Sequence, residues 1–393
     1  MKLAERMSRL GTETAFEVLV RAKALEAQGR EVVHLEIGEP DFDTPAHIIE
    51  AACQALHSGY THYGPSAGLP ELREAIAKDV SEFRGIRVNA NQVVVTPGAK
   101  PIMFFTILAL AGPGDEVIYP NPGFPIYESV INFAGAKPVP LRLAEEREFC
   151  IDLDELRSNV TPRTKMIIIN SPHNPCGSVL SLEDLQAIAE IATKYDTMVL
   201  ADEVYGRIVY DTEFFSITRF PGMVERTIIL DGFSKTYAMT GWRLGYGVMP
   251  EALAAQVAKL MTNSNSCTAS FTQMAGITAL KGPQDESYKM VAAFKERRDL
   301  IVKGLNAIPG IHCVLPKGAF YVFPNVKEVI KRGKFANAKA LADHWLQEAG
   351  VATLSGTAFG EYGEGYLRFS YANSIPNLNK ALQRIADAVA RLP

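Results

Sequence analysis

Short runs of β-branched and other apolar residues alternate along the chain with longer segments whose apolar residues recur at helical spacing. This alternation is typical of a mostly parallel sheet that is covered by helices on both faces. Strands are predicted at residues 92–98, 115–120, 137–143, 165–170, 197–203, 226–232 and 243–249. The clearest helix is predicted to begin at Ser181, where the sequence SLED offers a capping box before an apolar face.

The hydrophobic pattern changes after about residue 282. A long charged helix there precedes two short strands, FYVFPN and YLRFSYA, which helices separate and follow. The helix and strand of the first forty-odd residues match the main sheet neither in pattern nor in spacing, so we assign them to the same unit. We therefore predict an α/β fold in which residues 45–282 form a large domain with a seven-stranded, mostly parallel sheet flanked by helices. A smaller α+β domain is predicted from residues 1–44 and 283–393.

The composition narrows the class of protein. The 393 residues, 47% of them apolar, suffice for two or three domains with a sizeable core, and the net charge of −4 comes without a basic block. The most apolar run, PIMFFTILALAGPG, is shorter than the roughly 18 residues of a membrane span, and the N-terminus lacks a signal sequence. We therefore expect a cytoplasmic protein with neither a nucleic-acid nor a membrane partner. Five scattered cysteines without a C-x-x-C pair, and no histidine at zinc-ligand spacing, predict reduced structural thiols and no metal site.

The loops after the predicted strands carry the polar residues of interest. Parallel strands present their C-terminal ends at one edge of a sheet, where ligands bind. Reading only those loops (TPGAK, NPGFPIY, NSPHNPCG, DEVYG and FSKTYAMTGWR) brings together Asn174, Asp202, Tyr205, Lys235 and Arg243. Taken singly, each has a simpler interpretation: a helix cap for the aspartate, a solvated loop residue for the lysine, a turn for the asparagine, core for the tyrosine and a surface ion pair for the arginine.

Taken together, the motifs resemble one family. They are LEIGEPDFDTP (35–45), HYGPSAGLPELREAIA (62–77), NSPHNPCG, ADEVYG, SKTYAMTGWRLGY (234–246), KGAFYVFP (317–324) and LRFSYANS (367–374). In this order they are similar to the class I and II aminotransferases, pyridoxal-phosphate enzymes of fold type I, and within these to the aspartate-aminotransferase-like branch of bacteria and archaea. The resemblance runs nearly from end to end.

The resemblance implies pyridoxal 5′-phosphate as cofactor and assigns residues to its ring. Lys235 would carry the cofactor as a Schiff base and move the substrate's α-proton. Asp202 would keep the ring nitrogen protonated, which makes the ring a better electron sink. Asn174 and Tyr205 would donate hydrogen bonds to the phenolic oxygen, and Phe124 would stack on the ring face. Lys235, Asp202 and Tyr205 are thus the expected catalytic residues.

The phosphate is expected at the start of the helix that follows GAK. By the resemblance Arg243 would hold it, together with the N-terminal end of that helix, at Gly98, Ala99 and Lys100. Gly232 stands where some relatives place a serine that also contacts phosphate, so one side-chain contact is missing here. Tyr63 matches a tyrosine that reaches the neighbouring subunit's phosphate, which implies a homodimer with a shared active site.

The remaining assignments concern the substrate. Arg368 would grip the α-carboxylate as a planar fork, next to Gly38 and Asn174. The implied reaction moves the amino group of an L-amino acid to a 2-oxo acid by a ping-pong mechanism through an aldimine and a ketimine. Which amino donor and acceptor are used is not fixed by the sequence.

Other activities use parts of the same pattern. A C–S lyase or a decarboxylase of this fold would share these motifs, because fold does not fix function. A pyridoxal-phosphate-sensing regulator would need an additional DNA-binding segment, for which the N-terminus has neither room nor charge. A nicotinamide dehydrogenase is disfavoured because no G-x-G-x-x-G follows an early strand.

Overall fold

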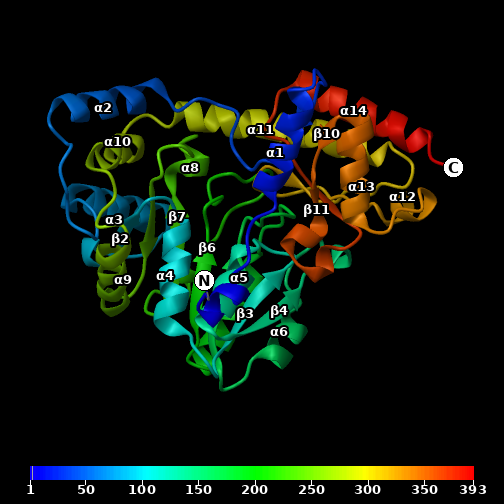
Figure 1. The fold of residues 1–393 in the computed structure, drawn as a ribbon. Coiled ribbons are helices and arrows are strands. Elements are labelled where there is room, and N and C mark those ends of the chain that lie inside the picture. Colours follow the sequence, from blue (N-terminus) through cyan, green and yellow to red (C-terminus); the bar gives the residue numbers. More distant parts are fainter. Residues whose placement is uncertain (2) are drawn as a thin grey trace.

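A seven-stranded sheet lies at the centre of the computed structural model, which describes residues 1 and 3–393 (Figure 1). Its strands are β2 (Val93–Thr96), β3 (Glu116–Asn121), β4 (Lys137–Arg142), β5 (Thr164–Asn170), β6 (Met198–Asp202), β7 (Thr227–Gly232) and β8 (Gly245–Val248). Their order is β2-β8-β7-β6-β5-β3-β4, and β8 alone runs in the direction opposite to the other six strands. The predicted strands and the mostly parallel sheet are confirmed. The largest differences are at β2, which ends two residues earlier than predicted, and at β8, which begins two residues later, after the left-handed backbone of Arg243 (φ 53°).

Helices cover both faces of this sheet. They are α2 (Ala46–His57), α3 (Pro70–Arg84), α4 (Lys100–Leu110), α5 (Ile126–Ala134), α6 (Leu153–Asn159), α7 (Leu182–Lys194), α8 (Phe233–Thr236), α9 (Glu251–Ser264) and α10 (Ser270–Lys281). Ile167 and Ile169 of β5 pack in one buried cluster with Leu185 of α7, whereas Ile168, between them, packs in another with Ile102 of α4. Alternate residues of a strand point to opposite faces, so β5 is apolar throughout because both faces are covered.

The predicted start of α7 is confirmed. The Ser181 hydroxyl accepts a hydrogen bond from the backbone N–H of Asp184 (3.1 Å), and the Asp184 carboxylate accepts one from the backbone N–H of Ser181 (3.0 Å). This reciprocal pair satisfies two N–H groups that have no partner within the helix.

The N- and C-terminal parts of the chain lie together. Their elements are α1 (Ala15–Glu26), β1 (Val33–His34), α11 (Asp285–Asn306), β9 (Tyr321–Val322), α12 (Lys327–Arg332), α13 (Ala338–His344), β10 (Val351–Ala352), β11 (Leu354–Ser355), β12 (Leu367–Ser370) and α14 (Ile375–Ala390). β1 pairs in parallel with β10, while β12 pairs antiparallel with both β9 and β11. The two strands expected in FYVFPN and YLRFSYA are present as β9 and β12. The boundaries at residues 45 and 282 stay a prediction.

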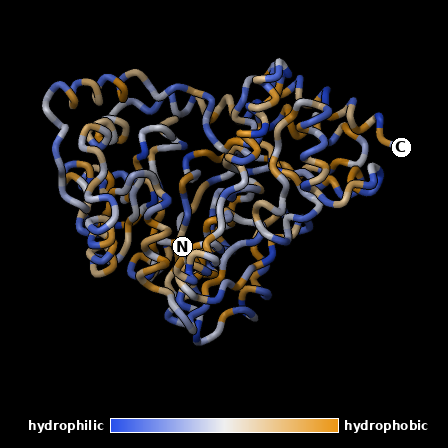
Figure 2. The backbone as a smooth tube through the Cα atoms, in the orientation of Figure 1, coloured by the Kyte–Doolittle hydropathy of each residue, from blue (hydrophilic) through white to orange (hydrophobic). Residues whose placement is uncertain are grey.

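Shorter helical turns connect these elements. They are η1 (Glu5–Arg9), η2 (Ala90–Gln92), η3 (Glu145–Arg147), η4 (Ile217–Arg219), η5 (Trp345–Ala349), η6 (Gly356–Phe359) and η7 (Glu361–Gly363). Hydrophobic and hydrophilic residues are interleaved along most helices (Figure 2). Among the described residues, none of the helices combines the length and the apolar character needed to cross a membrane.

Candidate active site

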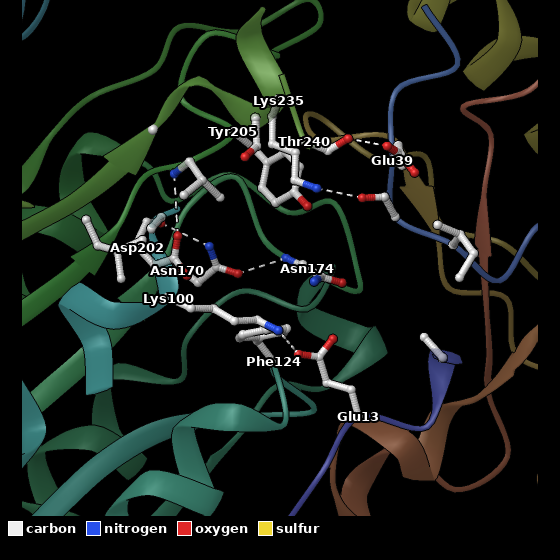
Figure 3. A pocket seen from close by; sticks show the side chains of 18 of the residues that line it. Glu13, Glu39, Lys100, Phe124, Asn170, Asn174, Asp202, Tyr205, Lys235 and Thr240 are labelled. Carbon is white, nitrogen blue, oxygen red and sulfur yellow. Dashed lines mark hydrogen bonds and ion pairs between the residues drawn. The ribbon is translucent and has the colours of Figure 1, made fainter. Parts of the chain in front are cut away.

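A cavity of about 560 Å³ opens at the C-terminal ends of β5, β6 and β7 (Figure 3). Segments from the N- and C-terminal parts of the chain form its other side. The predicted site residues that line it are Gly38, Ala99, Lys100, Phe124, Asn174, Asp202, Tyr205, Lys235, Arg243 and Arg368. The sheet edge thus gathers the predicted residues, as expected for an open α/β sheet.

Lys235 lies in α8, directly after β7. Its amine donates a hydrogen bond to the Gly38 carbonyl at 2.5 Å. Burial lowers the pKa of Lys235 to about 8, and the nearby cations act in the same direction, while Glu39 opposes them. Because the amine lines the cavity and is hydrogen-bonded to the backbone, Lys235 is not a solvated loop residue.

Asp202 ends β6 and is buried. One carboxylate oxygen accepts a hydrogen bond from the Tyr127 hydroxyl (2.5 Å), and the other accepts a longer one from the backbone N–H of Val204 (3.4 Å). Burial raises the pKa of Asp202 to about 6, although these hydrogen bonds oppose the shift. Among the described residues it forms no ion pair, and the chain after it makes a turn instead of a helix. The helix-cap interpretation is therefore wrong.

Asn170, which sequence reasoning missed, joins two strand ends at the bottom of the cavity. Its amide group donates to the Asp202 carbonyl (2.9 Å), and its side-chain oxygen accepts from the backbone N–H of Asn174 (2.9 Å). Asn170 is the last residue of a predicted strand. Searching the strand ends as well as the loops after them would therefore have found it. Tyr127, which positions Asp202, is the last residue of the loop NPGFPIY that follows a predicted strand, but it was not singled out there.

Arg368 of β12 is buried, with 5% of its surface exposed. Its guanidinium donates to the Glu36 carbonyl and to the Asn174 side-chain oxygen (3.3 Å), and lies 4.5 Å from the centre of the Tyr321 ring. Its Nε has no hydrogen-bond partner, and within the described chain no carboxylate pairs with it. Burial lowers the pKa of this guanidinium. A buried arginine of this kind is a strong site for a carboxylate.

The wall next to Arg368 is aromatic. The hydroxyls of Tyr205 and Tyr321 are hydrogen-bonded to each other at 2.7 Å, and both side chains are buried. Tyr321 also restricts Gly38, because a Cβ at that position would lie 2.2 Å from the Tyr321 hydroxyl oxygen. Glycine there lets the backbone approach the cavity closely.

A second anion site lies at the start of α4. Gly98 has a φ of +86°, and a Cβ at Gly98 would lie 2.2 Å from a guanidinium nitrogen of Arg243. The guanidinium of Arg243 therefore lies against the backbone that opens α4, where N–H groups point outward. Arg243 is oriented by a hydrogen bond of 2.8 Å to the Thr240 carbonyl. A helix N-terminus combined with an arginine favours a phosphate group.

Tyr63 behaves differently from the other predicted residues. Its side chain is 91% exposed and does not line the cavity of its own chain. Its predicted contact with a neighbouring subunit stays a prediction.

Known proteins resemble this chain over nearly its full length. A family model described as aminotransferase class I and II matches residues 30–385. The aspartate aminotransferase of Pyrococcus abyssi is 43% identical over 91% of this chain and 91% of its own. Aromatic-amino-acid aminotransferase 2 of Thermococcus litoralis is 39% identical over 98% of this chain and 97% of its own. The solved structure of the aspartate aminotransferase from Rhizobium meliloti is 36% identical, covers 100% of both chains and has a TM-score of 0.94.

Proposed function

The chain belongs to the class I and II aminotransferases, and from this premise we propose how its own residues carry out the reaction. The match confirms the family, the type I fold, the dependence on pyridoxal phosphate and the transfer of an amino group to a 2-oxo acid. The lyase, decarboxylase and regulatory alternatives are not favoured, because the relatives are named as aminotransferases. The roles of individual residues are the proposal.

The cavity fits pyridoxal phosphate in three respects. Lys235 offers an amine of lowered pKa to the carbonyl group of the cofactor. Asp202 offers a buried carboxylate without a cation partner among the described residues, which a protonated ring nitrogen would supply. The start of α4, with Arg243 beside it, suits the phosphate. When bound, this cofactor supplies an electron sink for bond breaking at the substrate's α-carbon.

The observation that carries the proposal is that the Lys235 amine, the buried Asp202 carboxylate and the guanidinium of Arg368 converge on one cavity. Burial raises the pKa of Asp202 and lowers that of Lys235, which is consistent with a functional site. The Lys235 amine takes the proton from the substrate's α-carbon and later returns it. Asp202, which Tyr127 holds in place, would serve as the ionised partner of a protonated ring nitrogen. Tyr205 and Asn174 would hold the cofactor through its phenolic oxygen.

Arg368 binds the α-carboxylate of every substrate. Its guanidinium lines the cavity and is fixed there by the Glu36 carbonyl and by the Asn174 side chain. Gly38, which has no side chain, lets the backbone come close to the substrate at the same place. Because all amino donors and oxo acids share an α-carboxylate, this contact serves both halves of the reaction.

Replacing Arg368 with lysine should lower kcat/KM by roughly 10- to 150-fold, because one charge-assisted hydrogen bond of a planar fork is lost. The loss should be alike for all amino donors and oxo acids, and cofactor affinity should barely change. Arg157→Lys, at an exposed arginine of α6, is the matched control. A loss confined to acidic donors such as aspartate would show that Arg368 reads a side-chain carboxylate instead.

We further infer a cytoplasmic homodimer in which Tyr63 reaches the partner's phosphate. The exposure of the Tyr63 side chain supports a contact outside its own chain. Tyr63→Phe should cost about 1.5–3 kcal/mol of cofactor affinity, the value of a hydrogen bond to a charged group.

A mixing experiment tests the shared site. Heterodimers of Tyr63→Phe and Arg243→Ala subunits should regain activity, since one of their two sites has both contacts intact. Activity no higher than that of either parent would show that Tyr63 serves its own subunit or none.

A further inference from the structure

Three carboxylates gather near the ends of β6 and β7, but only one of them lines the cavity. Asp202 ends β6, Glu203 follows it directly, and Asp231 lies on β7, the neighbouring strand. All three residues are buried. Like charges packed this closely oppose one another's ionisation, so a nearby cation is needed to keep more than one of them charged.

The cation is Arg84, the last residue of α3, whose side chain is fully buried. Its Nε donates to the Glu203 carboxylate at 2.6 Å, and a terminal nitrogen donates to the Asp231 carboxylate at 2.7 Å. Within the described chain, no other cation forms an ion pair with either carboxylate. With one positive charge against two negative ones, the cluster of Arg84, Glu203 and Asp231 keeps a surplus negative charge.

The other hydrogen bonds to this cluster come from uncharged donors. The Ser216 hydroxyl donates to Glu203 at 2.7 Å. Asp231 accepts from the Tyr246 hydroxyl (3.1 Å) and from the backbone N–H of Gly232 (2.7 Å). These donors hold the carboxylates in place but leave the charge balance unchanged.

The titratable groups around the cluster are either tyrosines or already paired. Asp202 faces the hydroxyls of Tyr127, on α5, and of Tyr205, in the turn after β6. Beside the cluster, Arg207 and Asp79 form their own ion pair at 2.7 Å, in which the two charges balance. The charges left to act on Asp202 from behind the cavity are therefore those of the cluster.

Stability alone does not explain a buried cluster of this kind. Taking charges out of water is costly, and apolar residues of similar volume often stabilise a fold as well or better. Its position points to the cavity instead. Burial raises the pKa of Asp202, and the negative charges of Asp231 and Glu203 add to this rise. A cation that neutralises them acts in the opposite direction.

We propose that Arg84 is a positioning residue for the reaction, which keeps Asp202 ionised by neutralising Glu203 and Asp231 behind it. This inference rests on the proposed function, in which the Asp202 carboxylate is the partner of a protonated ring nitrogen. Without Arg84, the uncompensated charges would draw a proton onto Asp202 and remove that partner. Lys235 cannot take over this task, because in the proposed function it is bound to the cofactor.

The first test is Arg84→Gln, which leaves the two carboxylates without a cation. Turnover requires ionised Asp202 and is lost below its pKa, so the acid limb of the pH profile of kcat should move up by about one pH unit. In holoenzyme whose cofactor carries nitrogen-15 in the ring, the NMR signal at neutral pH should shift toward that of an unprotonated ring, because the stronger negative field draws the shared proton toward Asp202. Arg84→Lys keeps the charge and should leave the acid limb in place. Arg87→Gln, at an exposed arginine just after α3, is the matched control.

Compensating variants separate the effect of charge from that of packing. Glu203→Gln removes one carboxylate and leaves Arg84 paired with Asp231, so the acid limb should move down by a similar amount. The double variant Arg84→Gln/Glu203→Gln restores the surplus of one negative charge. Its acid limb should return toward the original position although the ion pair is absent. A purely structural role predicts damage in all of these variants and no shifts of opposite sign.

The proposal is overturned by an acid limb that stays in place in either single variant, by an unchanged nitrogen-15 signal, or by a double variant no better than Arg84→Gln. Should Arg84→Gln fail to fold, the shift in Glu203→Gln and its reversal in the double variant decide the question. If these results fail while Asp202→Asn still lowers turnover, only the role of Arg84 is lost. Full turnover of Asp202→Asn would instead remove the proposed function of Asp202.

Discussion

Replacing Lys235 with alanine should lower transamination by at least about a hundredfold, because general acid–base catalysis alone is worth about 10²- to 10⁴-fold. Cofactor should still bind through Arg243, Asp202 and the start of α4. Steady-state turnover with confirmed cofactor occupancy is the measurement.

The control for this variant is Lys78→Ala, at a lysine of α3 whose side chain is 73% exposed. It removes the same charge from a solvated position and should leave turnover unchanged. Turnover of Lys235→Ala within tenfold of the unmodified protein would show that another group moves the α-proton.

Replacing Asp202 with asparagine should lower turnover by about 10²- to 10³-fold, as expected when one partner of a buried charge pair is removed. The fold should survive, because the asparagine oxygen can still accept the hydrogen bond of the Tyr127 hydroxyl, and only the longer contact to Val204 is lost. The thermal midpoint of the holoenzyme should therefore change little, while its turnover falls.

Asp196→Asn provides the matched control, since this aspartate precedes β6 and its side chain is 95% exposed. It lies at the opposite end of the strand from the cavity. Asp202→Asn with full cofactor occupancy and undiminished turnover would mean that the ring nitrogen does not face Asp202.

The sequence predicted the large sheet well because its strands are long and apolar on both faces. In β5 the run MIII needs two covering layers, and the structure supplies them through α4 and α7. The strands β10 and β11 were not predicted, and each has only two residues. The equally short β9 was predicted because it lies within the longer apolar run FYVFPN. The start of β8 was placed too early, because the left-handed backbone of Arg243 has no signature in the hydrophobic pattern.

The candidate site was predictable where residues end a strand or belong to a long motif. Asn174, Asp202, Lys235 and Arg368 all line the cavity as expected. Contacts between distant segments were not predictable, since Glu13 meets Lys100 across 87 positions of sequence. Such a contact depends on how the N-terminal segment crosses from α5 to α1, which only the fold determines.

The most direct measurement of the central assignment is reduction of the holoenzyme with borohydride, followed by peptide mapping. A cofactor bound to a lysine through a carbon–nitrogen double bond becomes permanently attached. We predict that the label lies on Lys235, in the peptide containing SKTYAMTGWR, and that Lys235→Ala protein carries none. A label on Lys100, or on Lys235→Ala protein, would contradict the account.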